Sequence, residues 1–274
     1  MILAGITFAG MNVCIKAVPN IPSVEIVFFR AVISFVLSLF FVLRKRISPW
    51  GTNKKVLLLR GLFGTVALIC FFYTLHVMPL ASAMVIHYLS PLFTALIAHF
   101  ALKERLKFAT LIFFLISLVG VFIMKGFDPR ISWSDALIGL VAAVMSGAAY
   151  NSIRKLKFSE DSNVIILYFP MVAFPITGFI LWVTHGFVMP TGRELGLLIL
   201  VGLLTQIAQY FLTRAYQSER ADKVASVSNL GVIYALILGY FMFGEVFNLT
   251  SLLGMFLVVS GVVLNVIPFN RFAR

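Results

Sequence analysis

Charged side chains are rare inside the long apolar runs of this 274-residue chain, so the few that occur there are the first candidates for chemistry. Arg30 lies in the stretch VEIVFFRAV, where a charge at the centre of a bilayer would cost about 2.5 to 3.5 kcal/mol. Arg30 could line an outer cavity and hold an anionic group. It could instead order the fold by pairing with Glu25, five residues earlier, or by capping helix-end carbonyls.

Uncharged polar side chains on predicted helix faces form a second set of candidates. Gln206, Gln209 and Thr213 follow the spacing i, i+3 and i+7, which places them on one face of a helix. Such a stripe can hydrogen-bond to a neighbouring helix, at about 0.6 to 2 kcal/mol per contact, or form the wall of a polar cavity. We predict substrate contacts first for Tyr88, Gln209 and Asn229. The further candidates are Gln206, Ser226, Asn12, Tyr73 and Asn151.

Titratable groups limit how transport of any solute could be coupled to protons. Among the acidic residues, Glu25 is placed inside an apolar run, whereas the others fall at run ends or between runs. His87 also lies inside a run, and histidine has a reference pKa near neutrality. Proton coupling therefore predicts Glu25 or His87 as the carrier, and exchange or facilitated diffusion without protons remains open.

The residues that an enzyme needs are missing from the predicted spans. The sequence has no GxSxG motif, no paired carboxylates within a run and no metal-ligand spacing of His, Cys, Asp or Glu. Cys14 and Cys70 are isolated in apolar segments and have no histidine partner that the sequence predicts. We therefore predict a protein that is not an enzyme and that uses neither a metal nor a cofactor.

The elements that must position these residues are membrane helices. The chain is 61% hydrophobic and only 12% charged, whereas soluble domains carry roughly a quarter charged residues. A membrane-spanning helix needs about 20 largely apolar residues. Ten runs meet this length approximately and predict an all-α integral membrane protein. They cover residues 2–18, 22–43, 56–77, 80–102, 106–124, 136–153, 164–184, 195–216, 224–243 and 249–267.

The positive charges predict the orientation of these spans. The net charge of +12 comes from Lys and Arg that cluster in the second, fourth, sixth and eighth connections and in the C-terminal tail. Cytoplasmic loops carry such an excess, so we expect a multi-pass protein of the inner, or plasma, membrane with both termini in the cytoplasm. These cations then determine topology, and no nucleic-acid partner is predicted.

An internal repeat divides the chain into two halves, residues 1–125 and 135–268. Without a gap, Gly61 falls on Gly202, Glu104 on Glu245 and Gly120 on Gly261. Each half has five spans, an odd number, so the second half must cross the membrane in the inverted orientation. Inverted repeats are typical of secondary transporters, whose substrate site lies near the midplane where the halves meet.

The repeat also suggests hinges and helix ends. Pro91 removes a backbone donor within the fourth span, and Gly231 weakens the equivalent place in the ninth span, which suits a hinge. Glu104 and Glu245 fall at span ends and are predicted to be structural. Lys16, at the outer end of the first span, is predicted to extend to the membrane interface.

Three motifs resemble the drug/metabolite transporter superfamily, and specifically its EamA type. They are FFYTLHVMPLASAMVIHYLSPLFTALIAHFALKERL at residues 71–106, YFLTRAYQSERADKVASVSNLGVIYALILGYFMFGEVF at residues 210–247, and VEIVFFRAV at residues 24–32. The resemblance covers essentially the whole chain and implies ten helices in two inverted five-helix repeats that work by alternating access. Because the family shares the arginine at position 30 across diverse substrates, the resemblance slightly favours a structural role for it. The repeats differ at Pro91, which matches Val232, and at Lys103, which matches Gly244.

These observations predict a secondary transporter, either an exporter or an exchanger, for a small polar metabolite. Arg30 and Lys16 favour an amino-acid-like or carboxylate-bearing substrate. A nucleotide-sugar or S-adenosylmethionine exchanger is the alternative within transport, and a membrane receptor or scaffold is the alternative outside it. The expected partners are the substrate and membrane lipid, and the sequence leaves a monomer and a homodimer equally open.

Overall fold

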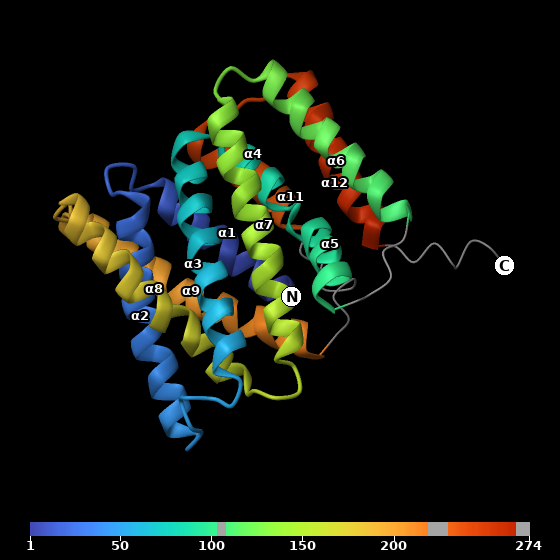
Figure 1. Cartoon of the computed structure of the whole chain (residues 1–274). Coiled ribbons are helices and arrows are strands. Elements are labelled where there is room, and N and C mark those ends of the chain that lie inside the picture. The colour runs from blue at the N-terminus through green and yellow to red at the C-terminus, as the bar shows by residue number, and fades with distance from the viewer. Residues whose placement is uncertain (103–107, 219–229, 267–274) are drawn as a thin grey trace.

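Within the residues that the computed structural model describes, 1–102, 108–218 and 230–266, the regular elements are all helices (Figure 1). In chain order they are α1 (Ile2–Lys16), α2 (Ser23–Arg44), α3 (Lys54–Val77), α4 (Leu80–His87), α5 (Ser90–Leu102), α6 (Phe108–Phe127), α7 (Trp133–Lys155), α8 (Ser162–Thr184), α9 (Gly192–Ser218), α11 (Leu230–Phe243) and α12 (Leu249–Val266).

These helices make the ten predicted spans. Six segments are long and apolar enough to cross a membrane, namely α2, α3, α4 with α5, α7, α8 and α9, and α1, α6, α11 and α12 contain shorter apolar stretches. Lipid offers the backbone no hydrogen-bond partners, so each apolar segment satisfies its own peptide groups as a helix. The protein is thus an all-α membrane protein of two inverted five-helix repeats, as the sequence predicts.

The connections separate into two ends of the bundle. The α2–α3 and α7–α8 connections lie at one end of the bundle (Figure 1). We call it the Met1 end, because Met1 packs there against the buried cluster that contains Val56 of α3 and Ile153 of α7. The α6–α7 connection lies at the opposite end, which we call the Glu245 end, where Arg130 Nη2 donates to the carbonyl of Val246 between α11 and α12. The Met1 end corresponds to the predicted cytoplasmic side.

Helices α6 and α12 lie side by side at one edge of the bundle and pack through glycines (Figure 1). A Cβ on Gly120 would lie 2.6 Å from the carbonyl oxygen of Gly254, and one on Gly261 would lie 2.6 Å from that of Phe113. The repeat matches Gly120 with Gly261 and Phe113 with Gly254. Matched residues therefore make matched contacts, as two inverted copies of one unit should.

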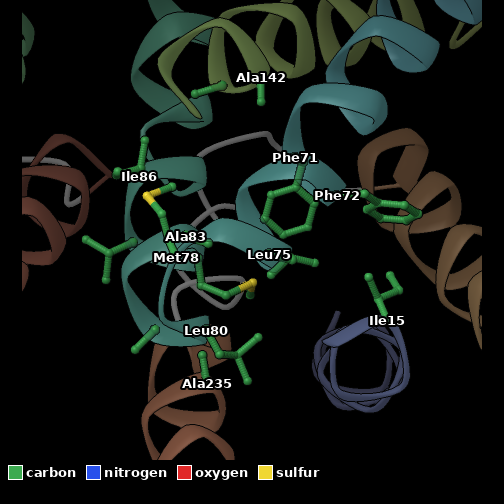
Figure 2. Close-up of a cluster of buried hydrophobic side chains, with 14 of the residues drawn as sticks. Ile15, Phe71, Phe72, Leu75, Met78, Leu80, Ala83, Ile86, Ala142 and Ala235 are labelled. Atoms are coloured by element: carbon green, nitrogen blue, oxygen red, sulfur yellow. The ribbon is translucent and has the colours of Figure 1, made fainter. Parts of the chain in front are cut away.

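A buried apolar cluster fills the bundle towards the Glu245 end. Figure 2 shows Phe72 and Leu75 of α3 and Ile86 of α4 in this cluster, with Ile15 contributed by α1. Each of these four side chains is fully buried. Between membrane helices such packing acts through dispersion and shape, because lipid is as apolar as the side chains. The cluster therefore holds α1, α3 and α4 together.

The fourth span is broken rather than bent. We expected one helix over residues 80–102 with a kink at Pro91, but α4 ends at His87 and α5 begins at Ser90. Tyr88 and Leu89 lie between them, and the amide of Leu89 donates to Ile86 in a tighter turn. Pro91 lies in the first turn of α5, where a missing backbone N–H costs little. The proline therefore starts a new helix after the break.

The glycine packing of α6 and α12 makes a prediction about stability. Gly120→Ala should lower the melting temperature by about 5 °C, because the added methyl group overpacks the interface by about 1 to 3 kcal/mol. Differential scanning fluorimetry in detergent measures this. Gly126→Ala is the matched control on the same helix, since nothing lies within 4 Å of its added Cβ. Equal melting temperatures for the two variants would contradict the close packing described here.

Candidate substrate site

A cavity lies between the two repeats and extends to the Met1 end of the bundle. It has a volume of about 120 Å³ and reaches Met1 itself. Helices from both repeats form its wall, among them α1, α3, α7 and α9. Its polar and aromatic lining residues are Asn12, Arg60, His87, Ser90, Ser146, Gln209, Phe8, Phe71, Phe169, Tyr88, Tyr150 and Tyr216.

Three of the predicted substrate contacts meet in this cavity: Asn12 on α1, Tyr88 after α4 and Gln209 on α9. Asn12 Nδ2 donates to the sulfur of Met84 at 3.0 Å, while Asn12 Oδ1 has no partner. Gln209 Oε1 likewise has no partner. Because buried amide oxygens normally accept a hydrogen bond, these two atoms have acceptor capacity that a bound solute could use.

Other predicted contacts lie outside the cavity. Tyr73 is partly exposed near the Glu245 end, where its hydroxyl donates to Asp135 at 3.1 Å. Asn151 donates to the carbonyls of Thr94 and Gly147 and so joins α7 to α5. Gln206 lies three residues before Gln209, but its side chain donates to Ser38 on α2. All three side chains thus bond to other structural elements. Gln206 Oε1 has no partner, but Gln206 is not among the residues that line the cavity. Ser226, Asn229 and Glu104 lie outside the described residues.

Arg30 is fully buried, but it is not among the residues that line the cavity. Its Nε donates to Thr205 Oγ1 at 2.9 Å, and its guanidinium lies 5.0 Å from the centroid of the Phe169 ring. The suggested pairing with Glu25 is wrong, because Glu25 Oε2 accepts from the backbone of Val188 at 2.9 Å. One turn and a half of helix separates the two residues, so their side chains leave α2 in different directions.

Arg60 is a cavity residue that was not predicted from the sequence. In the sequence it lies just beyond the positive residues of the second connection. Since α3 begins at Lys54, Arg60 lies about 9 Å into the helix. It is 3% exposed and lines the cavity. The available signal was its position beyond the predicted loop, since an ionisable residue inside a span marks a functional site by default.

The two candidates for proton coupling, His87 and Glu25, lie in different environments. His87 lines the cavity, stacks on Phe71 with ring centroids 4.2 Å apart, and has no partner at Nδ1. Glu25 lies in the first turn of α2 and holds the backbone of the α8–α9 connection. A proton carrier must reach the transport path, so the geometry supports His87 better, and proton coupling stays a prediction.

Tyr88 connects the cavity to the second repeat at the predicted hinge. Its hydroxyl packs directly against Gly231 of α11, where any side chain would overlap it. The residue after the α4 break therefore touches the residue that the repeat had suggested as the second hinge. This close approach explains the glycine at 231, and the hinge roles of Pro91 and Gly231 stay predictions.

An ion pair joins the two repeats at the Glu245 end. Lys16 Nζ lies 2.7 Å from Glu245 Oε1 and donates to the carbonyl of Met78 at 2.8 Å. The amide of Leu80 donates to the same carboxylate at 2.8 Å. Gly244 ends α11 with φ +61°, a left-handed conformation that suits glycine, and so directs Glu245 inward. The expected extension of Lys16 to the interface is wrong, since this inward partner attracts it.

A carboxylate also joins the repeats at the Met1 end. Glu160, in the α7–α8 connection, accepts from the amides of Thr52 and Asn53, each at 2.6 Å, and from the Thr52 hydroxyl at 2.7 Å. Partial burial acts to raise the pKa of Glu160, but these hydrogen bonds outweigh it and hold that pKa below its usual range. Glu160 therefore stays ionised and holds the α2–α3 connection in place.

The sequence also matches a known protein family. The model of the EamA-like transporter family matches the chain twice, at residues 1–125 and 133–267. The protein belongs to the EamA-like transporter family. It is therefore a transporter of the drug/metabolite superfamily rather than an enzyme.

The names of similar proteins refer to different solutes. This EamA-like transporter is 33% identical to the pseudopaline exporter CntI of Pseudomonas aeruginosa over 94% of this chain and 91% of the exporter. It is 30% identical to the riboflavin transporter of Rhizobium johnstonii over 89% of this chain and 82% of that protein. A crystal structure with TM-score 0.68 and 18% identity, which covers 96% of this chain and 94% of the other, shares the fold. The chain is thus a multi-pass membrane transporter of a small metabolite.

We expect the ion pair between Lys16 and Glu245 to keep the Glu245 end closed. Glu245→Gln leaves Lys16 without a counter-charge at a nearly buried position, which costs about 3 kcal/mol or more. In a Cys70→Ser background, alkylation of the neighbouring Cys14 by a maleimide should then accelerate by about tenfold or more. Glu194→Gln is the control, because this carboxylate accepts from Thr191 and forms no ion pair with a lysine of the described residues. If both variants react at the wild-type rate, the ion pair does not hold this end closed.

Proposed function

We propose that this EamA-like transporter is an alternating-access carrier that exports or exchanges an amino-acid-like or otherwise carboxylate-bearing metabolite across the plasma membrane, with both termini in the cytoplasm. The cavity carries this proposal. It lies between the two repeats, combines Arg60 with the unpartnered oxygens of Asn12 and Gln209, and reaches the predicted cytoplasmic end.

The arrangement of the two ends supports alternating access. The Lys16–Glu245 pair and the apolar cluster close the path beyond the cavity, while the cavity extends towards Met1. In a carrier, the contacts that close one end must be stable enough to keep that end closed. They must also be weak enough to break when the other end closes. A single ion pair and a few hydrogen bonds between repeats can be broken by the rocking of one repeat against the other.

Export is favoured over uptake by one relative and by the cavity. The pseudopaline exporter CntI matches nearly the full length of this chain, and a cavity reaching the predicted cytoplasmic side can load solute there. A second candidate function within transport is exchange of an S-adenosylmethionine-like or nucleotide-like metabolite. The stacked rings of Tyr150 and Tyr216, 4.9 Å apart at the cavity wall, favour it, because they offer an aromatic surface to a base.

Transport by purified protein tests the proposal. Proteoliposomes should take up labelled amino acids, their derivatives or carboxylates in exchange for the same unlabelled solute. Gln209→Ala should lower the rate by about tenfold, because a hydrogen bond to the solute is lost. Gln206→Ala is a matched control on the same helix and should stay within about twofold of wild type, since Gln206 bonds Ser38 instead. If wild-type protein exchanges no metabolite of any class, the proposal fails.

A further inference from the structure

Among the described residues, Arg60 is a cation that is deeply buried and also lines the cavity. It is 3% exposed, lines the cavity, and its Nε has no hydrogen-bond acceptor. A guanidinium presents planar paired donors that match the two oxygens of a carboxylate or phosphate. The side chain therefore has unused donor capacity of a kind that suits an anion.

A second buried guanidinium adds to the positive charge near Arg60. The Phe169 ring lies 5.5 Å from the guanidinium of Arg60 and 5.0 Å from that of Arg30. Both Nη atoms of Arg30 lack hydrogen-bond partners. The negative face of one aromatic ring partly stabilises two cations, but it removes neither charge.

No carboxylate in the described part of the chain neutralises these two cations. The ion pairs found there are Lys16 with Glu245 and Arg130 with Asp128. Glu25, on the same helix as Arg30, binds the backbone of Val188 instead. Buried charges in proteins are normally paired, and two like charges left together destabilise the fold. A ligand with net negative charge would supply what the protein lacks.

Gly64 of α3 provides the space that the Arg60 side chain occupies. A Cβ at Gly64 would lie 2.5 Å from Arg60 Nη1 and 2.9 Å from the Phe169 ring. Gly64 is one turn after Arg60 and also lines the cavity. The glycine leaves space for the guanidinium to lie along α3 beside Phe169 rather than extend to the Met1 end.

Resting on the proposed transport function, we infer that Arg60 binds the anionic group of the substrate and that the transported metabolite carries a net negative charge through a carboxylate or phosphate. Arg30 is a positioning residue, because Thr205 and Phe169 hold it beside the cavity, where its charge adds to that of Arg60. This assigns the anion contact to Arg60 rather than to Arg30, the residue that the sequence suggested.

Ligand stabilisation tests the anion site directly. Succinate, citrate, glutamate and glycerol 3-phosphate are each compared with their uncharged or less charged amide or dephosphorylated counterparts by thermal shift on the purified full chain. At least one anion should raise the melting temperature of wild type, and its counterpart should not. Arg60→Met should abolish the shift, Arg60→Lys should restore part of it, and Lys54→Met, at an exposed cation on the same helix, should leave it unchanged.

A second measurement needs no ligand and separates a binding role from a structural one. Arg60→Met removes an unneutralised buried charge, so the melting temperature of the substrate-free protein should stay the same or rise. A fall would show that Arg60 holds the fold together and would overturn the inference. The inference also fails if no anion stabilises wild type, or if the anions still stabilise Arg60→Met.

The outcome is distinguishable from failure of the proposed function. If proteoliposomes transport a neutral or cationic metabolite, and Arg60→Met carries it at the wild-type rate, the protein is a transporter without this anion site. If wild type binds anions through Arg60 but exchanges none of them, the anion site stands and the transport function fails.

Discussion

A buried charge in this bundle has lost most of its contact with water, so the way in which each charge is or is not neutralised organises the molecule. At the Glu245 end, Lys16 and Glu245 come from opposite repeats and neutralise each other. At the Met1 end, Glu160 is held by backbone amides of the other repeat. Between them lie Arg30 and Arg60, for which the described part of the chain offers no carboxylate. Charged groups thus join the repeats at both ends, whereas the two buried cations between them have no carboxylate partner in the described residues, as the proposed binding of an anionic solute requires.

The inverted repeat explains why the two halves can behave alike without being identical. Glycines of α6 and α12 make matched contacts across the pseudo-symmetric pair. In the fourth span, Tyr88 and Leu89 interrupt the helix, and Tyr88 packs against Gly231 of the second repeat. The break therefore lies beside the cavity and in contact with the second repeat, where the sequence predicts a hinge.

The cavity also explains how one fold serves relatives with differently named solutes. Ligand sites generally combine aromatic walls with a few polar groups that determine orientation, and this cavity has both kinds of group, such as Tyr150 with Tyr216 and Asn12 with Gln209. Substitution of a few such groups would change the solute without disturbing the helices, because the contacts between helices use other residues. Gln206 and Asn151 illustrate this separation, since both are polar and both serve the contacts between helices.

The sequence by itself determined the spans, their order and the inverted repeat, because hydropathy and helix formation in lipid depend on residues that are close together along the chain. It also identified Asn12, Tyr88, Gln209 and His87, which the structure brings into one cavity. Only the tertiary structure decided which charges meet. Lys16 finds Glu245 and Arg30 finds Thr205 and Phe169 across helices far apart in sequence, and Arg60 turns from the helix end to the cavity. Those contacts depend on which helix faces pack together, and a repeating apolar pattern carries little information about that choice.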